Sequence, residues 1–288
     1  MEVIWKAALL GLVQGITEFL PVSSSAHLLL LRDLLDLDHG SFVKFLDILI
    51  QFASVLAMVV YFFRTLFPPV LFRVMFTGSF KKHFELCRSA EMRPVMDLWQ
   101  KIALGFLPIA VIGFIAAKLD WKDALDEQPW VRVGALLVGG ILLLRVERWC
   151  RHEHPAETIA ELSFRAAMLI GLAQCLAIIP GMSRMASTII AALALGAARP
   201  VAAEYSFMLA IPTMFGASAY SLLKFLKSGT SLSTNEGIAL AVGVTVSFLV
   251  SLSVISWLMR FIKKHTFEPF GWYRIALAAA VACWLLLD

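Results

Sequence analysis

Six long apolar stretches constrain the fold of this sequence more than any other feature. A helix needs roughly 20 mostly apolar residues to cross the hydrocarbon core of a bilayer. The mean hydropathy of +0.81 over 288 residues is also far above that of a soluble domain. The sequence therefore predicts an all-α integral membrane protein with six transmembrane helices. These spans are expected at about 42–63, 99–119, 131–149, 201–226, 238–261 and 271–287.

Two further apolar segments are interrupted in the middle. Residues 5–37 contain Pro21, and residues 165–198 contain Pro180 followed by Gly181. Proline removes a backbone donor and disfavours helical geometry in the preceding residue, so each segment should break there and restart. The halves are too short to span a bilayer. We expect two re-entrant helical hairpins, with Ser183 as a cap for the second restart.

The two halves of the chain are similar in content. Gln14 precedes Pro21-Val22-Ser23-Ser24, and Gln174 precedes Pro180-Gly181-Met182-Ser183. Each broken segment is followed by three spans. We predict two repeats, residues 1–150 and residues 160–288.

Loop charges predict that the two repeats are inverted. The loop 64–98 holds six Lys or Arg residues, whereas the loop 120–130 holds Lys122 alone against four acids. Because Lys and Arg concentrate in cytoplasmic loops, the first loop should be cytoplasmic and the second external. The mouth of the first hairpin then opens outside and that of the second inside. Such inverted repeats bring two discontinuous helices together near the midplane.

The remaining composition excludes other classes of protein. No basic run is long enough, or interleaved with exposed aromatics, to indicate nucleic-acid binding. The four cysteines are scattered without a Cys-x-x-Cys pair, which predicts free thiols and neither a disulfide framework nor a zinc site. They are Cys87, Cys150, Cys175 and Cys283.

Polar groups cluster at the two breaks. Glu18, the serines of residues 23–25 and His27 lie at the first break, and Arg184 follows the second. An ionisable group near the bilayer centre costs roughly 2.5 to 3.5 kcal/mol on insertion scales, so such a cluster indicates a functional site. The alternative to a functional site is a set of purely structural roles. The serines would only cap helices, His27 would be a core histidine, and Arg184 would be a counter-ion to Glu18 or Glu204.

These residue types suit phosphate chemistry. Helix N-termini and serine hydroxyls bind phosphate, and Arg184 offers a planar fork of donors. Ser24 and His27 are three residues apart, which places them on one helix face. Glu18 could hold a divalent cation or handle a proton.

Three segments carry a family resemblance. Glu18-Phe-Leu-Pro-Val-Ser-Ser-Ser-Ala-His27, Pro180-Gly-Met-Ser-Arg-Met-Ala-Ser-Thr188 and Glu204-Tyr-Ser-Phe-Met-Leu-Ala-Ile-Pro212 resemble the signatures of the undecaprenyl-diphosphate phosphatase (BacA) family. The resemblance implies a multi-pass enzyme of the bacterial inner membrane, with its site facing the outer side. Its members hydrolyse undecaprenyl diphosphate to the monophosphate and phosphate, which recycles the lipid carrier for peptidoglycan synthesis and confers bacitracin resistance.

The resemblance also implies site residues, a cofactor and partners. The expected partners are the polyprenyl diphosphate, membrane lipids and a second copy in a homodimer, with Mg²⁺ or Ca²⁺ as cofactor. Gln14 stands where some members have a second glutamate, so Glu18 is the one expected metal ligand. Met185-Ala186 replaces a usual Ser-Gly, and Ala26 a usual glycine. The expected catalytic residues are Glu18, Ser24, His27 and Arg184, and the expected substrate-binding residues are Ser23, Ser25, Ser183 and Thr188.

Two questions stay open at the level of sequence. The attacking group is expected to be Ser24 activated by His27, with water activated by His27, or His27 itself, as alternatives. A polyprenyl-phosphate flippase or transporter is the rival function, because inverted repeats with broken helices are also transporter architecture.

Overall fold

The computed structural model describes residues 2–37, 40–75, 89–119, 121, 125, 128–150, 153–227 and 232–287. Within these residues the regular structure is helical, which confirms the predicted all-α class. Six of the described helices are long and apolar enough to cross a membrane. They are α3 (Ser41–Tyr61), α7 (Arg93–Lys118), α9 (Pro129–Trp149), α12 (Arg199–Lys227), α13 (Thr234–Phe261) and α14 (Glu268–Leu287).

The loops that connect the spans are described in part. Two short helices, α4 (Phe63–Leu66) and α5 (Pro69–Met75), continue the chain beyond α3. Three predicted free thiols, Cys150, Cys175 and Cys283, are free in the structure. Cys87 and several of the loop cations used to predict the orientation lie outside the described residues, namely Lys81, Lys82, Arg88 and Lys122.

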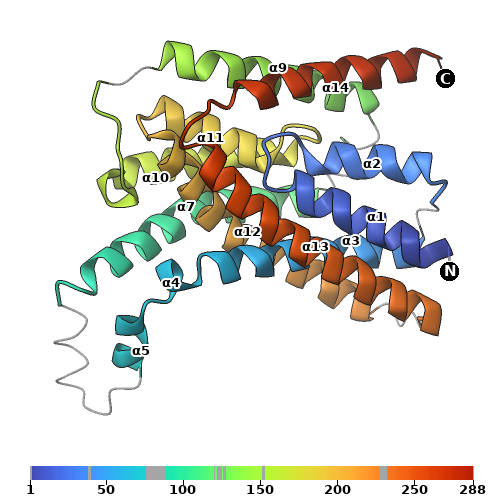
Figure 1. Cartoon of the computed structure of the whole chain (residues 1–288), viewed down its shortest axis with the longest axis horizontal. Coiled ribbons are helices and arrows are strands. Elements are labelled where there is room, and N and C mark those ends of the chain that lie inside the picture. Colours follow the sequence, from blue (N-terminus) through green and yellow to red (C-terminus); the bar gives the residue numbers. More distant parts are fainter. Residues whose placement is uncertain are drawn as a thin grey trace.

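Both predicted interruptions are present as breaks between helices. The first lies between α1 (Glu2–Thr17) and α2 (Ser24–Leu34), at Pro21. The second lies between the 3₁₀ turn η2 (Cys175–Ile178), which extends α10 (Phe164–Gln174), and α11 (Arg184–Ala194). Figure 1 shows the two hairpins entering from opposite ends of the molecule, with their tips close to its centre. We call residues 18–23 the first tip and residues 179–183 the second tip.

The helices of the two halves pack against each other at glycine contacts. Helix α1 packs on α13, α10 on α7, and α14 lies beside α9 (Figure 1). A Cβ at Gly11 would collide with the carbonyl oxygen of Gly243, and one at Gly171 with that of Gly105. Such small residues let helix backbones approach closely inside a membrane. Each hairpin is therefore held by a helix from the other half of the chain.

Buried polar contacts reinforce this scaffold. Ser54 of α3 bonds to Ser247 and Ser251 of α13, at 3.1 and 3.0 Å between the hydroxyl oxygens. The fully buried Lys101 of α7 donates to Asp97 at 2.6 Å and to the carbonyls of Ile159 and Ala160 at 2.9 Å each. These bonds satisfy groups that would otherwise be costly to bury.

One apolar cluster supports both tips. Phe19 and Val22 of the first tip belong to the same buried cluster as Met185 and Ala186 of α11. Phe19 is fully buried, and its ring meets that of Phe207 of α12 at 5.7 Å between centroids. Met185 and Ala186 thus pack in the apolar core beside the first tip.

Candidate active site

The two tips share a backbone feature. Ser23 and Ser183, the residues that precede α2 and α11, adopt positive φ angles of 74° and 67°. Non-glycine residues pay about 1 to 3 kcal/mol for such geometry and concentrate at functional sites. Ser183 caps α11 as predicted, because its hydroxyl oxygen accepts from the amide of Ala186 at 3.2 Å. Each tip is thus followed directly by a helix whose N-terminus lies at the break.

Glu18 is the centre of the polar contacts. Its carboxylate is buried, and Oε2 accepts from Gln14 Nε2 at 3.0 Å and from Ser24 Oγ at 2.7 Å. The other oxygen, Oε1, lies 3.7 Å from Nη2 of Arg184. One carboxylate therefore joins the serine of the first hairpin to the arginine of the second.

Arg184 is the first residue of α11 and faces the first tip. Its Nη1 atom is buried and has no hydrogen-bond partner among the described residues. An unsatisfied buried donor costs about 1 to 3 kcal/mol. A guanidinium with an unsatisfied donor, beside a single carboxylate, is suited to an anionic ligand.

His27 is held away from Ser24. Its Nδ1 lies 2.8 Å from the carbonyl oxygen of Ser23, so Nδ1 carries the proton and donates. Its Nε2 then accepts from the hydroxyl of Tyr273 at 2.6 Å, and the two rings stack at 5.6 Å between centroids. The expected Ser24–His27 bond is thus absent from this part of the structure, in which Ser24 donates to Glu18.

The expected substrate-binding residues lie at different depths. Ser23 is buried and its hydroxyl oxygen is 3.2 Å from that of the exposed Ser25. Ser183 lies in the second tip beside Arg184. Thr188 lies one turn into α11, fully buried, and donates to the carbonyl of Arg184 at 3.0 Å. The structure therefore brings Ser23 and Ser183 to the two breaks and places Thr188 behind them.

Two site residues come from α14 and were missed by the sequence reasoning. Tyr273 contacts His27, and the fully buried Arg274 donates to the carbonyls of Pro21 and Gly181, one in each tip, at 3.2 and 3.0 Å. An arginine inside an apolar stretch is itself a signal, since ionisable residues within membrane spans are rare and functional.

An apolar groove begins at His27. It has a volume of about 330 Å³ and lies between α1, α2 and α14. Apart from His27, its walls are aliphatic and aromatic: Val13, Leu30, Leu31, Leu34, Leu277, Ala280, Val281 and Trp284. The polar cluster thus adjoins a surface that suits a hydrocarbon chain.

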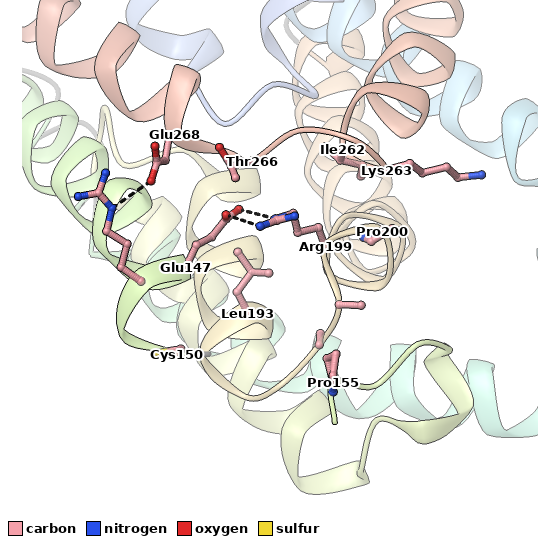
Figure 2. A pocket seen from close by; sticks show the side chains of 13 residues that line it. Glu147, Cys150, Pro155, Leu193, Arg199, Pro200, Ile262, Lys263, Thr266 and Glu268 are labelled. Atoms are coloured by element: carbon pink, nitrogen blue, oxygen red, sulfur yellow. Dashed lines mark hydrogen bonds and ion pairs between the residues drawn. The ribbon is translucent and has the colours of Figure 1, made fainter. Parts of the chain in front are cut away.

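A second cavity, of about 620 Å³, lies at the other end of α11 (Figure 2). Its arginines are neutralised, because Arg199 pairs with Glu147 at 3.0 Å and Arg148 with Glu268 at 3.1 Å. The Lys263 ammonium points away from the other lining residues in Figure 2. Its lining also includes Thr266 and the free thiol of Cys150.

The metal-binding capacity of the site is limited to one carboxylate. Among the described residues, no group of three His, Cys, Asp or Glu side chains is placed to hold a metal ion. A cation at Glu18 would depend on Oε1, because Oε2 already accepts two hydrogen bonds. Mg²⁺ usually takes one or two carboxylates together with substrate phosphates and water, which this arrangement fits.

Comparisons with known proteins find similar proteins along nearly the whole chain. The undecaprenyl-diphosphatase of Aquifex aeolicus (strain VF5) is 38% identical over 282 residues, 98% of each chain. Undecaprenyl-diphosphatase 1 of Clostridioides difficile (strain 630) is 41% identical over 287 residues, 99% of this chain and 97% of the relative. The family model for the bacitracin resistance protein BacA matches residues 7–280. The chain belongs to the BacA family.

Proposed function

We propose that the chain hydrolyses undecaprenyl diphosphate to undecaprenyl phosphate and inorganic phosphate, at a site formed by the two hairpin tips. The observation that carries the site assignment is the contact chain Ser24–Glu18–Arg184, which joins a nucleophile, a carboxylate and a guanidinium across two separate hairpins. Relatives that are similar over nearly their full length are undecaprenyl-diphosphatases. The activity recycles the lipid carrier of cell-wall synthesis and accounts for bacitracin resistance.

The diphosphate would bind between Arg184 and the start of α2. Arg184 presents Nη1, which has no partner among the described residues. In the described chain Ser23 makes no side-chain cap bond to α2, so the first amides of that helix can donate to phosphate oxygens. Phosphoryl transfer depends mainly on such positioning and charge stabilisation.

Ser24 is the proposed nucleophile, with Glu18 as its base. Ser24 Oγ attacks the terminal phosphorus, its proton passes to Glu18 Oε2 at 2.7 Å, and the bond from that phosphorus to the bridging oxygen breaks. Undecaprenyl phosphate leaves. Water then cleaves the serine phosphate, with His27 as base after its Nε2 exchanges the Tyr273 hydroxyl for water.

A divalent cation, Mg²⁺ or Ca²⁺, is part of the proposal. Glu18 Oε1 and the oxygens of the substrate would hold it. When bound, it neutralises charge on the diphosphate. Gln14 keeps Glu18 Oε2 oriented toward Ser24, in place of a second carboxylate.

The groove at His27 would hold the first part of the isoprenyl tail. It is apolar along its length beyond His27, and it begins beside the proposed phosphate site. Burial of apolar surface is worth roughly 25 cal/mol per Å². The tail would then add affinity and also direct the diphosphate toward Ser24.

The architecture we propose is an inverted repeat in the inner membrane with two re-entrant hairpins. Support comes from two equivalent packing contacts, α1 on α13 and α10 on α7. In the order of the two halves α1 corresponds to α10, and α7 corresponds to α13. The Lys and Arg bias of the loops favours a substrate entrance on the outer side.

Phosphate release from undecaprenyl diphosphate by the purified chain tests the proposal. Wild type should release phosphate, and Ser24→Ala, Glu18→Gln and Arg184→Ala should lose the activity. The matched control is Ser253→Ala, an exposed serine whose hydroxyl bonds only to its own helix in the described structure. An inert wild type, with magnesium or calcium supplied, would overturn the function.

A second candidate function is movement of the lipid between leaflets. The observation that favours it is the cavity at the opposite end of α11 from the tips. Labelled lipid diphosphate in liposomes should stay in its leaflet with Arg184→Ala if hydrolysis is the whole function. Its movement with this inactive variant would support a flippase.

A further inference from the structure

Arg274 is a buried cation whose hydrogen bonds go to backbone. It is fully buried in α14, and its four described acceptors are carbonyl oxygens. Two belong to α9, namely Ala135 at 2.9 Å and Leu136 at 3.3 Å. The other two belong to the hairpin tips, Pro21 at 3.2 Å and Gly181 at 3.0 Å. One guanidinium therefore joins both tips to α9.

The two tip carbonyls occupy equivalent positions. Pro21 lies two residues before Ser23, and Gly181 lies two residues before Ser183. Ser23 and Ser183 precede α2 and α11 and both have positive φ angles. Arg274 thus contacts the same point of each break. Because the donors of a guanidinium are fixed in a plane, these bonds set the distance between the tips.

Helix α9 provides the space for this arginine. A Cβ at Gly139 would lie 2.8 Å from Cζ of Arg274 and would collide with its Nη2. The space at Gly139 is therefore occupied by the guanidinium.

We propose that Arg274 is a positioning residue for the reaction: it fixes the spacing of the two tips, and with it the gap between Glu18 and Arg184 in which the diphosphate binds. This inference rests on the proposed site. Arg274 is no catalytic residue, because it contacts the backbone behind the site. Its effect reaches the reaction through Pro21, three residues from Glu18, and through Gly181, three residues from Arg184.

Kinetics of phosphate release from undecaprenyl diphosphate test this role. Arg274→Lys keeps the charge but lacks the planar fork. Its kcat should fall about 100-fold with a smaller change in KM, since a misplacement of about 1 Å can cost that much. Lys101→Met is the matched control, because Lys101 is a buried cation that holds carbonyls away from the tips. It should lower the melting temperature and leave kcat unchanged.

A double-mutant cycle separates positioning from general stability. Gly139→Ala should lower kcat by displacing the guanidinium, while Gly134→Ala, in the same helix with open space around it, should not. In an Arg274→Met background the effect of Gly139→Ala should disappear, since the two substitutions act on one contact. Arg274→Lys remains informative if Arg274→Met does not fold.

The outcomes distinguish this inference from the proposed function. An active wild type with unchanged kcat in folded Arg274→Lys and Gly139→Ala would overturn the positioning role and leave the function intact. A kcat loss in Lys101→Met equal to that in Arg274→Lys would also overturn it. An inert wild type, or a fully active Glu18→Gln, would overturn the proposed site and this inference with it.

Discussion

The two hairpin tips have similar backbones and different side-chain chemistry. Each breaks at a proline and presents a serine with positive φ before a new helix. The first tip brings together Glu18, Ser24 and His27, whereas the second contributes Arg184 and a capped helix. Two similar breaks thus provide two helix N-termini, and we propose from their different side chains that the first is the reacting half and the second the binding half.

The largest expected effect distinguishes a serine of the first hairpin from one of the second. Ser24→Ala removes the proposed nucleophile and should lower kcat on the order of 10⁶-fold, as loss of a nucleophilic serine does in a hydrolase. Ser183→Ala changes the serine that precedes α11 in the second tip and should cost far less. Phosphate release by both variants gives the comparison. Equal losses would show that the tips do not differ in role.

The next effect concerns the binding half. Arg184→Lys retains the positive charge but loses the bidentate fork, and it should lower kcat/KM by about 10²-fold. Steady-state kinetics with undecaprenyl diphosphate measure this. The control is Arg148→Lys, at an exposed ion pair of the opposite cavity, which should keep the wild-type value. Full activity of Arg184→Lys would mean that only charge is needed.

A third effect is on stability and compares the N-terminal caps of α11 and α2. Ser183→Ala removes a cap bond and should lower the free energy of unfolding by about 1 kcal/mol. Ser23→Ala should cost less, because Ser23 makes no side-chain cap bond in the described structure. Denaturant titration in detergent compares the variants. A larger loss of stability in Ser23→Ala than in Ser183→Ala would contradict this, because it would mean that Ser23 caps α2.

The smallest effect is expected at the contact between α14 and His27. Tyr273→Phe keeps the ring stack but removes the hydroxyl 2.6 Å from Nε2. Loss of one neutral hydrogen bond, about 1 kcal/mol, loosens the orientation of His27 but also frees its Nε2 for water, so kcat should change by no more than about fivefold. The exposed Tyr220→Phe serves as control. A loss comparable to that of Ser24→Ala would make Tyr273 part of the reaction itself.

The fold was predictable where local properties decide it. Span positions follow from apolar length, and the breaks at Pro21 and Pro180 follow from the geometry of proline. Ser183 was also correctly predicted as a cap, since that bond joins residues three apart.

The contacts within the site were less predictable, because they join distant segments. The sequence placed Arg184 opposite the first hairpin, with Glu18 or Glu204 as alternative counter-ions, and it paired Ser24 with His27 on the basis of helix spacing. The break separates Glu18 from Ser24 and folds the carboxylate back over the hydroxyl, which spacing along one helix cannot show. Arg274 was missed because its role arises from carbonyls far away in sequence.

A double-mutant cycle between the hairpins tests most directly whether the two tips form one active site. Phosphate release from undecaprenyl diphosphate would be measured for wild type, Glu18→Gln, Arg184→Ala and the double variant. Because both side chains are predicted to act on one diphosphate, their losses in kcat/KM should be strongly non-additive, with a coupling of about 0.5 to 3 kcal/mol. Strictly additive losses would contradict a site shared by the two hairpins.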